Sequence, residues 1–188
     1  MKKIKENKFM RKEKISDKQF LLIINGPSCG GKSEVAKVIL ERYGGIYNGK
    51  SDVIKWLISD YNSSTHKNIV FEMTLATIRV ALRRGLSALT EGALFGPERL
   101  VQLAKKASVP LFVINIEAPE DVLNARFLDR IEAKIGGARV ANIDPKRFKE
   151  LKSLYAETKM ESPLEFDSSR QKPEEIADAV VKYLRENL

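Results

Sequence analysis

The sequence predicts an α/β fold in which a central five-stranded parallel sheet is covered by helices on both faces, in three layers. Two observations carry this prediction. Short apolar runs without a period-two pattern alternate with longer segments of helical apolar spacing, which is typical of a buried parallel sheet. A glycine-rich stretch, residues 26–33, also joins the first apolar run to the first helical segment. Because folds of this class bind ligands beyond the carboxyl ends of their strands, we expect a ligand site at that edge of the sheet.

The individual elements follow from the spacing of apolar residues and from the residues that begin and end each segment. Strands are expected where short apolar runs lie between turn residues, at 20–25, 46–47, 86–90, 111–116 and 164–166. Helices are expected at about 34–43, 52–58, 68–84, 97–107, 118–130, 145–159 and 173–188. The segment 131–144 contains Gly136 and Gly137 and few large apolar residues, so we expect it to be mobile. It would form part of a small helical lid at about 127–145.

The composition is that of one soluble domain, predicted at 19–188, preceded by a basic arm at 1–18. Of the 188 residues, 43% are hydrophobic, which excludes disorder over most of the chain. No apolar run approaches the roughly 18 residues of a membrane span, and no apolar segment follows the basic N-terminus as a secretory signal would require. A single cysteine fits a reducing compartment. We therefore expect a cytoplasmic protein without a membrane contact, either a monomer or a homodimer.

The net charge of +8 is concentrated near the N-terminus. Residues 1–18 carry eight basic and three acidic side chains, which leaves a net charge of only +3 for the rest of the chain. A phosphate-binding pocket accounts for an excess of that size. The arm has two interpretations, a solvated and poorly ordered segment or a contact with nucleic acid or a partner, and we expect the first.

The glycine-rich stretch matches the pattern G-x-x-x-x-G-K-[ST] at every constrained position. Gly26, Gly30 and Gly31 would let the backbone wrap a phosphate chain, and the following helix would point its unpaired N–H groups at the anion. Lys32 would reach the β- and γ-phosphates of ATP, and the Ser33 hydroxyl would bind Mg²⁺. The alternative is a glycine-rich turn that binds nothing, but the strand before it and the helix after it both favour the phosphate site.

Three neighbouring positions complete the set of residues that we expect to contact the nucleotide. They are Ser28, Cys29 and Glu34. Cys29 lies close to a helix N-terminus, where the pKa of a thiol can be lowered, but filling a variable position of the loop is the simpler role. The nucleotide contacts here would be made mainly by the backbone.

From about residue 20 to 187 the chain resembles the small P-loop kinases, which include adenylate, shikimate and gluconate kinases, chloramphenicol phosphotransferase, zeta toxins and polynucleotide kinase. Besides the glycine-rich motif, the resemblance rests on the segment KSDVIK at 50–55, similar to the S-x-D-x-x-R of polynucleotide kinase-like and zeta toxin-like members. It implies that Asp52 orients the acceptor hydroxyl and accepts its proton. Lys55 stands at the position of the arginine, where it would contact the acceptor or simply be exposed. The alternative, from local sequence alone, is that Ser51 and Asp52 simply cap a helix, and the two roles can coexist.

A second segment, at 89–99, is similar to the third-strand region of these kinases. Glu91 replaces their usual aspartate, which implies that it holds Mg²⁺ through water or contacts the acceptor. Ala93 and Leu94 are apolar where polynucleotide kinase relatives carry threonine and asparagine. The alternative for Glu91 is a solvated acid at the end of a strand.

Three arginines complete the resemblance. Arg126 and Arg130 are four residues apart on one helical face and resemble the pair that clamps the transferring phosphates, with Arg126 also contacting the nucleotide. Arg139 lies beyond the two lid glycines and resembles the lid arginine of adenylate kinases, where it would contact the substrate. The alternative for all three is an ordinary surface charge.

Together these residues predict an ATP- and Mg²⁺-dependent kinase that acts on a small-molecule, nucleotide or nucleotide-sugar acceptor. Two other classes remain open. A regulatory NTPase is less favoured, because no D-x-x-G or N-K-x-D element follows the glycine-rich motif. A module that binds nucleic acid or a protein partner and holds nucleotide as a structural ligand is supported mainly by the basic arm.

Overall fold

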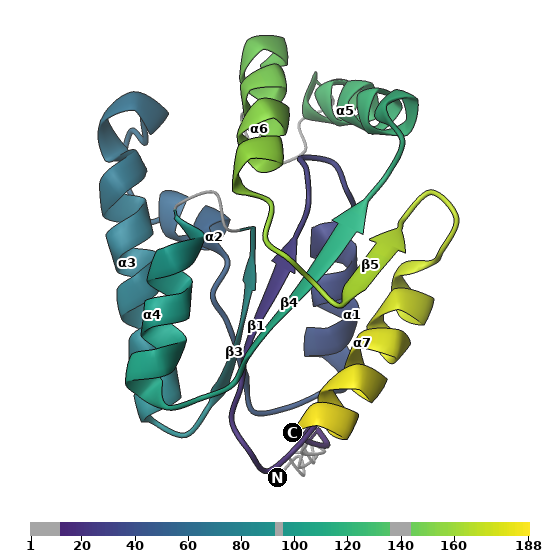
Figure 1. Ribbon diagram of the computed structural model, residues 1–188. Helices are drawn as coiled ribbons and strands as arrows, with labels where there is room; N and C mark the ends of the chain where they lie inside the picture. Colours follow the sequence, from purple (N-terminus) through teal and green to yellow (C-terminus); the bar gives the residue numbers. More distant parts are fainter. Residues whose placement is uncertain (1–11, 93–95, 136–143) are drawn as a thin grey trace, which may run out of the picture.

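The computed structural model describes residues 12–92, 96–135 and 144–188. Its centre is a five-stranded sheet in the order β2-β3-β1-β4-β5, and every pair of neighbouring strands is parallel (Figure 1). The strands are β1 (Leu21–Asn25), β2 (Ile46–Asn48), β3 (Ser87–Glu91), β4 (Leu111–Glu117) and β5 (Leu164–Asp167). The three-layer α/β/α fold with a five-stranded parallel sheet is confirmed.

Helices cover both faces of the sheet and stand above the carboxyl ends of the strands. α1 (Lys32–Arg42) and α7 (Pro173–Asn187) pack on one face, whereas α3 (Ser63–Arg83) and α4 (Pro97–Ala107) pack on the other (Figure 1). The remaining helices are α2 (Ser51–Lys55), α5 (Glu120–Ile135) and α6 (Pro145–Thr158). Figure 1 places α5 and α6 at the top, where the strand arrows end. None of the helices in the described part of the chain is long and apolar enough to cross a membrane.

The central strand β1 contributes to the core on both sides of the sheet. Leu22 and Ile24 pack with the residues of α1 and α7, and Leu21 and Ile23 pack with those of α3 and α4. All four side chains are fully buried. Because both faces of this strand are covered, its sequence needs apolar residues at consecutive positions, which explains the unbroken run.

The boundary between the second and third helices differs from the prediction. α2 ends at Lys55, and Trp56 and Leu57, predicted within this helix, follow it with 64% and 70% of their surface exposed. α3 begins at Ser63 rather than at residue 68, because the Asn62 side chain accepts a hydrogen bond from the backbone N–H of Ser64 at 2.8 Å. Polar residues that the sequence suggested as a turn therefore start the next helix.

The helix before the predicted lid is longer than expected. α5 continues through Ile135, so residues 131–135 are helical rather than part of a mobile segment. The five residues after Arg130 include good helix formers, and the first strong helix breaker is Gly136. Residues 136–143, which include Arg139, lie outside the described residues, and the lid at 127–145 stays a prediction.

The end of the basic arm packs against the domain. Ile15 is buried in the core beside α1 and α7, and the backbone carbonyl of Glu13 accepts a hydrogen bond from Gly44 N–H at 2.9 Å. Arg185 of α7 also pairs with the Glu13 carboxylate at 2.9 Å. Residues 12–18 of the predicted arm therefore pack against the domain, since an apolar side chain in this segment reaches the core, and the division into arm and domain stays a prediction. Residues 1–11 lie outside the described part of the chain.

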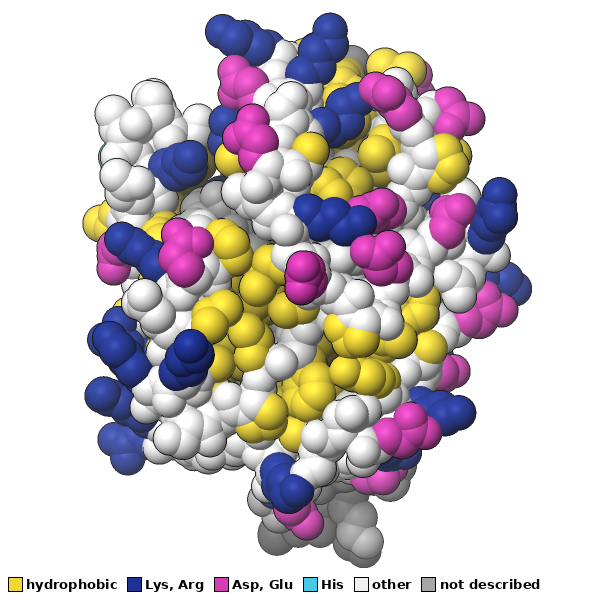
Figure 2. Space-filling model, viewed as in Figure 1, with side chains coloured by type: hydrophobic (Ala, Val, Ile, Leu, Met, Phe, Trp, Pro, Cys, Tyr) yellow, Lys and Arg dark blue, Asp and Glu magenta, His cyan; other side chains and the backbone are white. Residues whose placement is uncertain are grey.

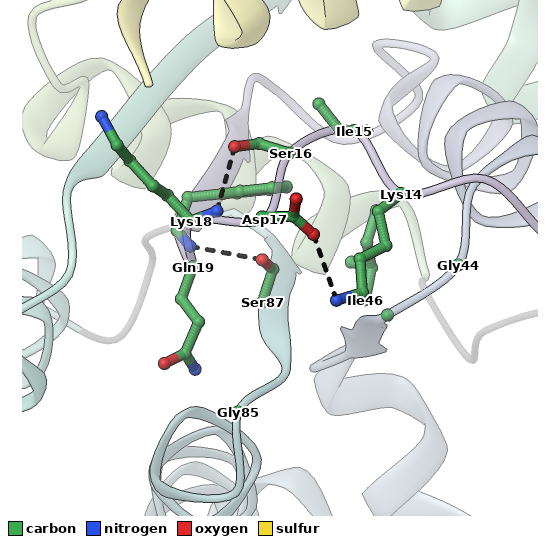
Figure 3. A pocket seen from close by; sticks show the side chains of 12 residues that line it. Lys14, Ile15, Ser16, Asp17, Lys18, Gln19, Gly44, Ile46, Gly85 and Ser87 are labelled. Carbon is green, nitrogen blue, oxygen red and sulfur yellow. Dashed lines mark hydrogen bonds and ion pairs between the residues drawn. The ribbon is translucent and has the colours of Figure 1, made fainter.

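A small pocket lies where this segment meets the amino ends of the strands (Figure 3). Residues 14–20 line it together with Gly44, Gly45, Ile46, Gly85 and Ser87. The volume is about 20 Å³, which is room for about one water molecule. Because the pocket is this small and lies at the opposite end of the sheet from the glycine-rich turn, it is not the ligand site predicted from the sequence.

Candidate functional site

The glycine-rich turn connects β1 to α1 in a conformation that requires glycine at two of its positions. Gly26 lies against β4 so closely that a Cβ atom there would be 2.1 Å from the carbonyl oxygen of Ile116. Gly31 has φ +91° and is the N-cap of α1, where its carbonyl accepts hydrogen bonds from Glu34 and Val35. The turn therefore ends at the N-terminus of an 11-residue helix, which favours binding of an anion.

Lys32 folds back over this turn. Its Nζ donates hydrogen bonds to the carbonyl oxygens of Gly26, at 2.9 Å, and Pro27, at 2.6 Å. Burial lowers the pKa of Lys32 to about 8; the Glu91 carboxylate opposes this change, and the positive charge of Arg130 adds to it. Burial without a phosphate therefore destabilises the ammonium form, and an anion bound in the turn would stabilise it.

Ser33, Glu91 and Lys50 form a compact polar cluster beside the turn. The Ser33 hydroxyl donates to Glu91 Oε2 at 2.5 Å, and Lys50 Nζ donates to Ser33 Oγ at 2.7 Å. Lys50 Nζ also lies 3.1 Å from Glu91 Oε1. The two residues that the sequence predicted as metal ligands are thus brought together, with a cationic group in contact with both.

Lys50 was not singled out by sequence reasoning. It follows β2, and it reaches Glu91 because β2 pairs with β3, the strand that ends in Glu91. The order of strands in a parallel sheet cannot be read from one sequence, so this contact could not be predicted. The available signal was the position of a lysine just beyond the carboxyl end of a strand, where ligand-binding residues gather.

The oxygen atoms of this cluster are suitable ligands for a magnesium ion. A hydroxyl and a carboxylate are hard oxygen ligands, and the Lys50 ammonium shows that a cation is favourable between them. No group of three or more His, Cys, Asp or Glu side chains that could hold a metal occurs within residues 12–92, 96–135 and 144–188. A metal ion here would therefore need further oxygen ligands from nucleotide phosphates and water.

Asp52 lies in the first turn of α2, two residues beyond Lys50. Its Oδ1 atom pairs with Lys55 Nζ at 2.5 Å, and the two side chains are 38% and 31% exposed. The N-cap of α2 is Lys50, which makes no side-chain capping bond, so Ser51 and Asp52 do not serve as the cap that their local sequence suggested. The Asp52 carboxylate thus remains partly exposed to solvent.

The two arginines of α5 both lie near the glycine-rich turn but differ in their contacts. Arg126 donates from Nη1 to the Cys29 carbonyl at 3.2 Å and to Ser168 Oγ at 2.8 Å, and from Nη2 to the Ser168 carbonyl at 2.8 Å. It therefore ties the turn to the loop after β5. Arg130 is exposed, and its charge is close enough to lower the pKa of Lys32.

The other predicted nucleotide contacts have more ordinary surroundings. Cys29 is buried against Phe127 and Phe148, whose rings stack at 4.3 Å, so it packs the turn against α5 and α6. Ser28 lies beside Cys29, with 4.0 Å between their side-chain oxygen and sulfur atoms, and Glu34 is exposed in the first turn of α1. Arg139, Ala93 and Leu94 lie outside the described residues.

Comparisons with known proteins show the fold. No protein-family model matches the chain, and no curated protein matches it in sequence. Among solved structures, it is similar to a proposed kinase from Chloroflexus aurantiacus, with 19% identity, a TM-score of 0.66, and coverage of 92% of this chain and 100% of that one. It is also similar to the tunicamycin resistance protein of Deinococcus radiodurans, with 16% identity, a TM-score of 0.58, and coverage of 89% and 95%.

A third similar structure is the APS kinase of Mycobacterium tuberculosis, solved with AMPPNP and APS. It shares 19% identity with this chain at a TM-score of 0.57, and the match covers 89% of this chain and 98% of the kinase. At these levels of identity the comparisons establish the architecture rather than the reaction. The chain therefore shares its three-layer α/β/α fold with these proteins.

Proposed function

We propose that the protein is an ATP- and Mg²⁺-dependent kinase that transfers the γ-phosphoryl group to a hydroxyl or phosphate of a small-molecule, nucleotide or nucleotide-sugar acceptor. One observation carries the proposal. Lys50 is held against Ser33 and Glu91, and Asp52, a carboxylate suited to the acceptor, follows two residues later in the first turn of α2. A regulatory NTPase has no need of such a carboxylate. The fold shared with an APS kinase solved with AMPPNP and APS supports this assignment.

The donor side would bind ATP through the backbone of the turn and the Lys32 ammonium. Lys32 would leave the carbonyls of Gly26 and Pro27 and contact the β- and γ-phosphates. Ser33 and Glu91 would hold Mg²⁺, which supplies neutralisation of the phosphate charge when bound. Arg130 is exposed on α5 and would approach the γ-phosphate, while Arg126 would keep α5 attached to the turn.

On the acceptor side, Asp52 would orient the acceptor group and take its proton as the new P–O bond forms. Lys55 pairs with Asp52 in the free protein and would be available to an acceptor phosphate. The half-exposed Val53 and the more exposed Trp56 and Leu57 lie beside Asp52 in the chain. These side chains favour an acceptor that carries an apolar or aromatic part.

A polynucleotide acceptor is less favoured by the sequence, because Ala93 and Leu94 are apolar where polynucleotide kinase relatives carry threonine and asparagine. Figure 2 shows basic side chains at the upper end of the molecule and also at the lower left, over the carboxyl ends of α3 and α4, where Arg83, Lys105 and Lys106 lie. The latter positions stabilise the helix dipoles and lie at the opposite end of the sheet from Asp52. One similar structure, with 15% identity and a TM-score of 0.61, belongs to an RNA repair complex, and the match covers 46% of that chain. This acceptor class therefore belongs in the test.

The proposal is tested by acceptor screening with the full chain. ATP labelled at the γ-phosphate and Mg²⁺ would be incubated with hydroxyl-bearing aromatic compounds, nucleosides, nucleotides, nucleotide sugars and 5′-hydroxyl oligonucleotides. We expect a labelled product for at least one class, and none with Lys32→Ala. Release of inorganic phosphate with no labelled product for any acceptor would contradict the proposal, as would thermal stabilisation by GTP but not by ATP.

A further inference from the structure

Lys50 makes contacts that would be expected of a bound metal ion. Its ammonium nitrogen contacts Ser33 Oγ at 2.7 Å and Glu91 Oε1 at 3.1 Å. These oxygens belong to the two residues that fit Mg²⁺ in this fold. The side chain of Lys50 is 26% exposed and that of Glu91 only 9%, so the pair is largely shielded from water.

The backbone around Lys50 is attached to the strand that carries Glu91. Gly49 N–H donates to the Leu89 carbonyl at 2.7 Å, and Thr90 Oγ1 donates to the Gly49 carbonyl at 3.0 Å. A Cβ atom at Gly49 would be 2.7 Å from the Ile78 side chain, so the chain passes close to α3 here. Lys50 is therefore placed at Glu91 by main-chain contacts rather than by chance.

The charges explain why Lys50 and a metal ion would exclude each other. A buried carboxylate needs a positive partner, and Lys50 provides one when no metal is bound. An ammonium group and a divalent cation cannot share contacts to Ser33 and Glu91, because like charges repel strongly in a site shielded from water. Only the phosphate oxygens of a nucleotide would add enough ligands for Mg²⁺ to displace the ammonium.

We propose that Lys50 is an internal cation that occupies the Mg²⁺ position until nucleotide arrives, so that metal and nucleotide bind together rather than in sequence. The inference rests on the proposed function for the identity of the metal site. Lys50 acts here as a positioning residue: it holds the Glu91 carboxylate in place, and it weakens metal binding to the nucleotide-free protein.

The direct test is a titration of the nucleotide-free full chain with Mn²⁺, followed by electron paramagnetic resonance. Lys50→Met removes the charge and keeps the length of the side chain, and we expect it to bind Mn²⁺ about tenfold more tightly than the unchanged protein. Equal or weaker binding by the variant would overturn the proposal. No nucleotide or acceptor is present, so the result does not depend on kinase activity.

Two further variants give the titration its controls. Lys152→Met also removes a lysine with a poorly exposed side chain from an ion pair, with Glu120, outside the cluster, and it should leave Mn²⁺ affinity unchanged. Combining Lys50→Met with Glu91→Gln should return Mn²⁺ binding to the weak level of the unchanged protein. If the double variant keeps the tighter binding, the metal lies elsewhere and the proposal is wrong.

A measurement on the unchanged protein guards against misfolding of the variants. Lysines would be labelled with an amine-reactive reagent and quantified by mass spectrometry with and without Mg²⁺–AMPPNP. We expect labelling of Lys50 to rise several-fold on addition of the complex, since the ammonium would leave its protected position. Unchanged labelling, with AMPPNP binding shown by a thermal shift, would count against the proposal. Absence of that shift would instead contradict the proposed function, and the Mn²⁺ titration would still decide the role of Lys50.

Discussion

The donor and acceptor sides of the candidate site are built in different ways. Lys32 and Ser33 begin α1 after the turn that follows β1, and Glu91 ends β3. Lys32 donates to the Gly26 carbonyl, and Ser33 donates to Glu91. Asp52 and Lys55 lie on a five-residue helix in which only Ile54 is buried. The donor side is thus positioned by the most buried part of the fold, and the acceptor side by one of its least packed elements. A shared fold therefore bears more directly on the proposed donor side than on the proposed acceptor side.

The largest effect is expected from the donor side. Lys32→Ala should lower kcat for phosphoryl transfer by about 10³-fold, because it removes the main charge that would stabilise the transferring phosphate. The measurement is transfer from labelled ATP to the acceptor found by screening. Lys37→Ala, at an exposed lysine of the same helix, is the matched control and should retain activity. Full activity of Lys32→Ala would contradict the assignment of Lys32 to the donor side of the site.

A smaller and more selective effect is expected from the acceptor side. Asp52→Asn should lower kcat by about 10²-fold and leave ATP affinity unchanged, because the carboxylate would act on the acceptor alone. Nucleotide affinity is measured by equilibrium binding of AMPPNP. Asp60→Asn, just beyond α2, changes an exposed aspartate in the same way and should behave as the unchanged protein. Equal loss of nucleotide affinity and kcat would show that the two sides are not separable.

The smallest effect, on stability rather than on activity, is expected outside the donor and acceptor sides of the site, where Lys159 bridges β4 and β5. Lys159 pairs with Glu117 at 2.9 Å and with Glu165 at 3.0 Å. The hydrogen bond from Lys159 lowers the pKa of Glu165, and the hydrogen bonds to Glu117 and Glu165 raise the pKa of Lys159. Because these groups are exposed, Lys159→Met should lower the midpoint of thermal unfolding at pH 7 by only about 1–2 °C.

The pH dependence of this loss follows from the two shifts. A carboxyl group whose pKa is lowered by folding stabilises the folded state above its usual pKa, and this stabilisation is lost as the pH falls through the lowered value. A lysine whose pKa is raised by folding stabilises the folded state until the pH rises through the raised value. The difference in the midpoint of thermal unfolding between Lys159→Met and the unchanged protein should therefore be present at pH 7 and disappear at pH 3. Thermal unfolding at both values checks this. A loss of phosphoryl transfer with the same variant would extend the functional site to β5.

Much of the fold was predictable because its signals are local. The run from Leu21 to Ile24 needs apolar residues at each position, since β1 is covered on both faces, and so it is visible as a strand. The glycine-rich turn was predictable for a similar reason, because the positive φ of Gly31 and the close approach of Gly26 to β4 demand glycine. The end of α2 was not predictable, because Trp56 and Leu57 are apolar but lie outside the core.

By itself, the sequence determined the class of fold and the position of the glycine-rich turn, and it predicted Ser33 and Glu91 as oxygen ligands of a metal ion. These features depend on residue type and on spacing along a single segment. Only the tertiary structure decided that Lys50 contacts both of those residues and that Ile15 of the arm belongs to the core. Such contacts join residues from separate segments. They form because β2 pairs with β3 and because α1 and α7 lie on one face of the sheet, an order that local spacing does not encode.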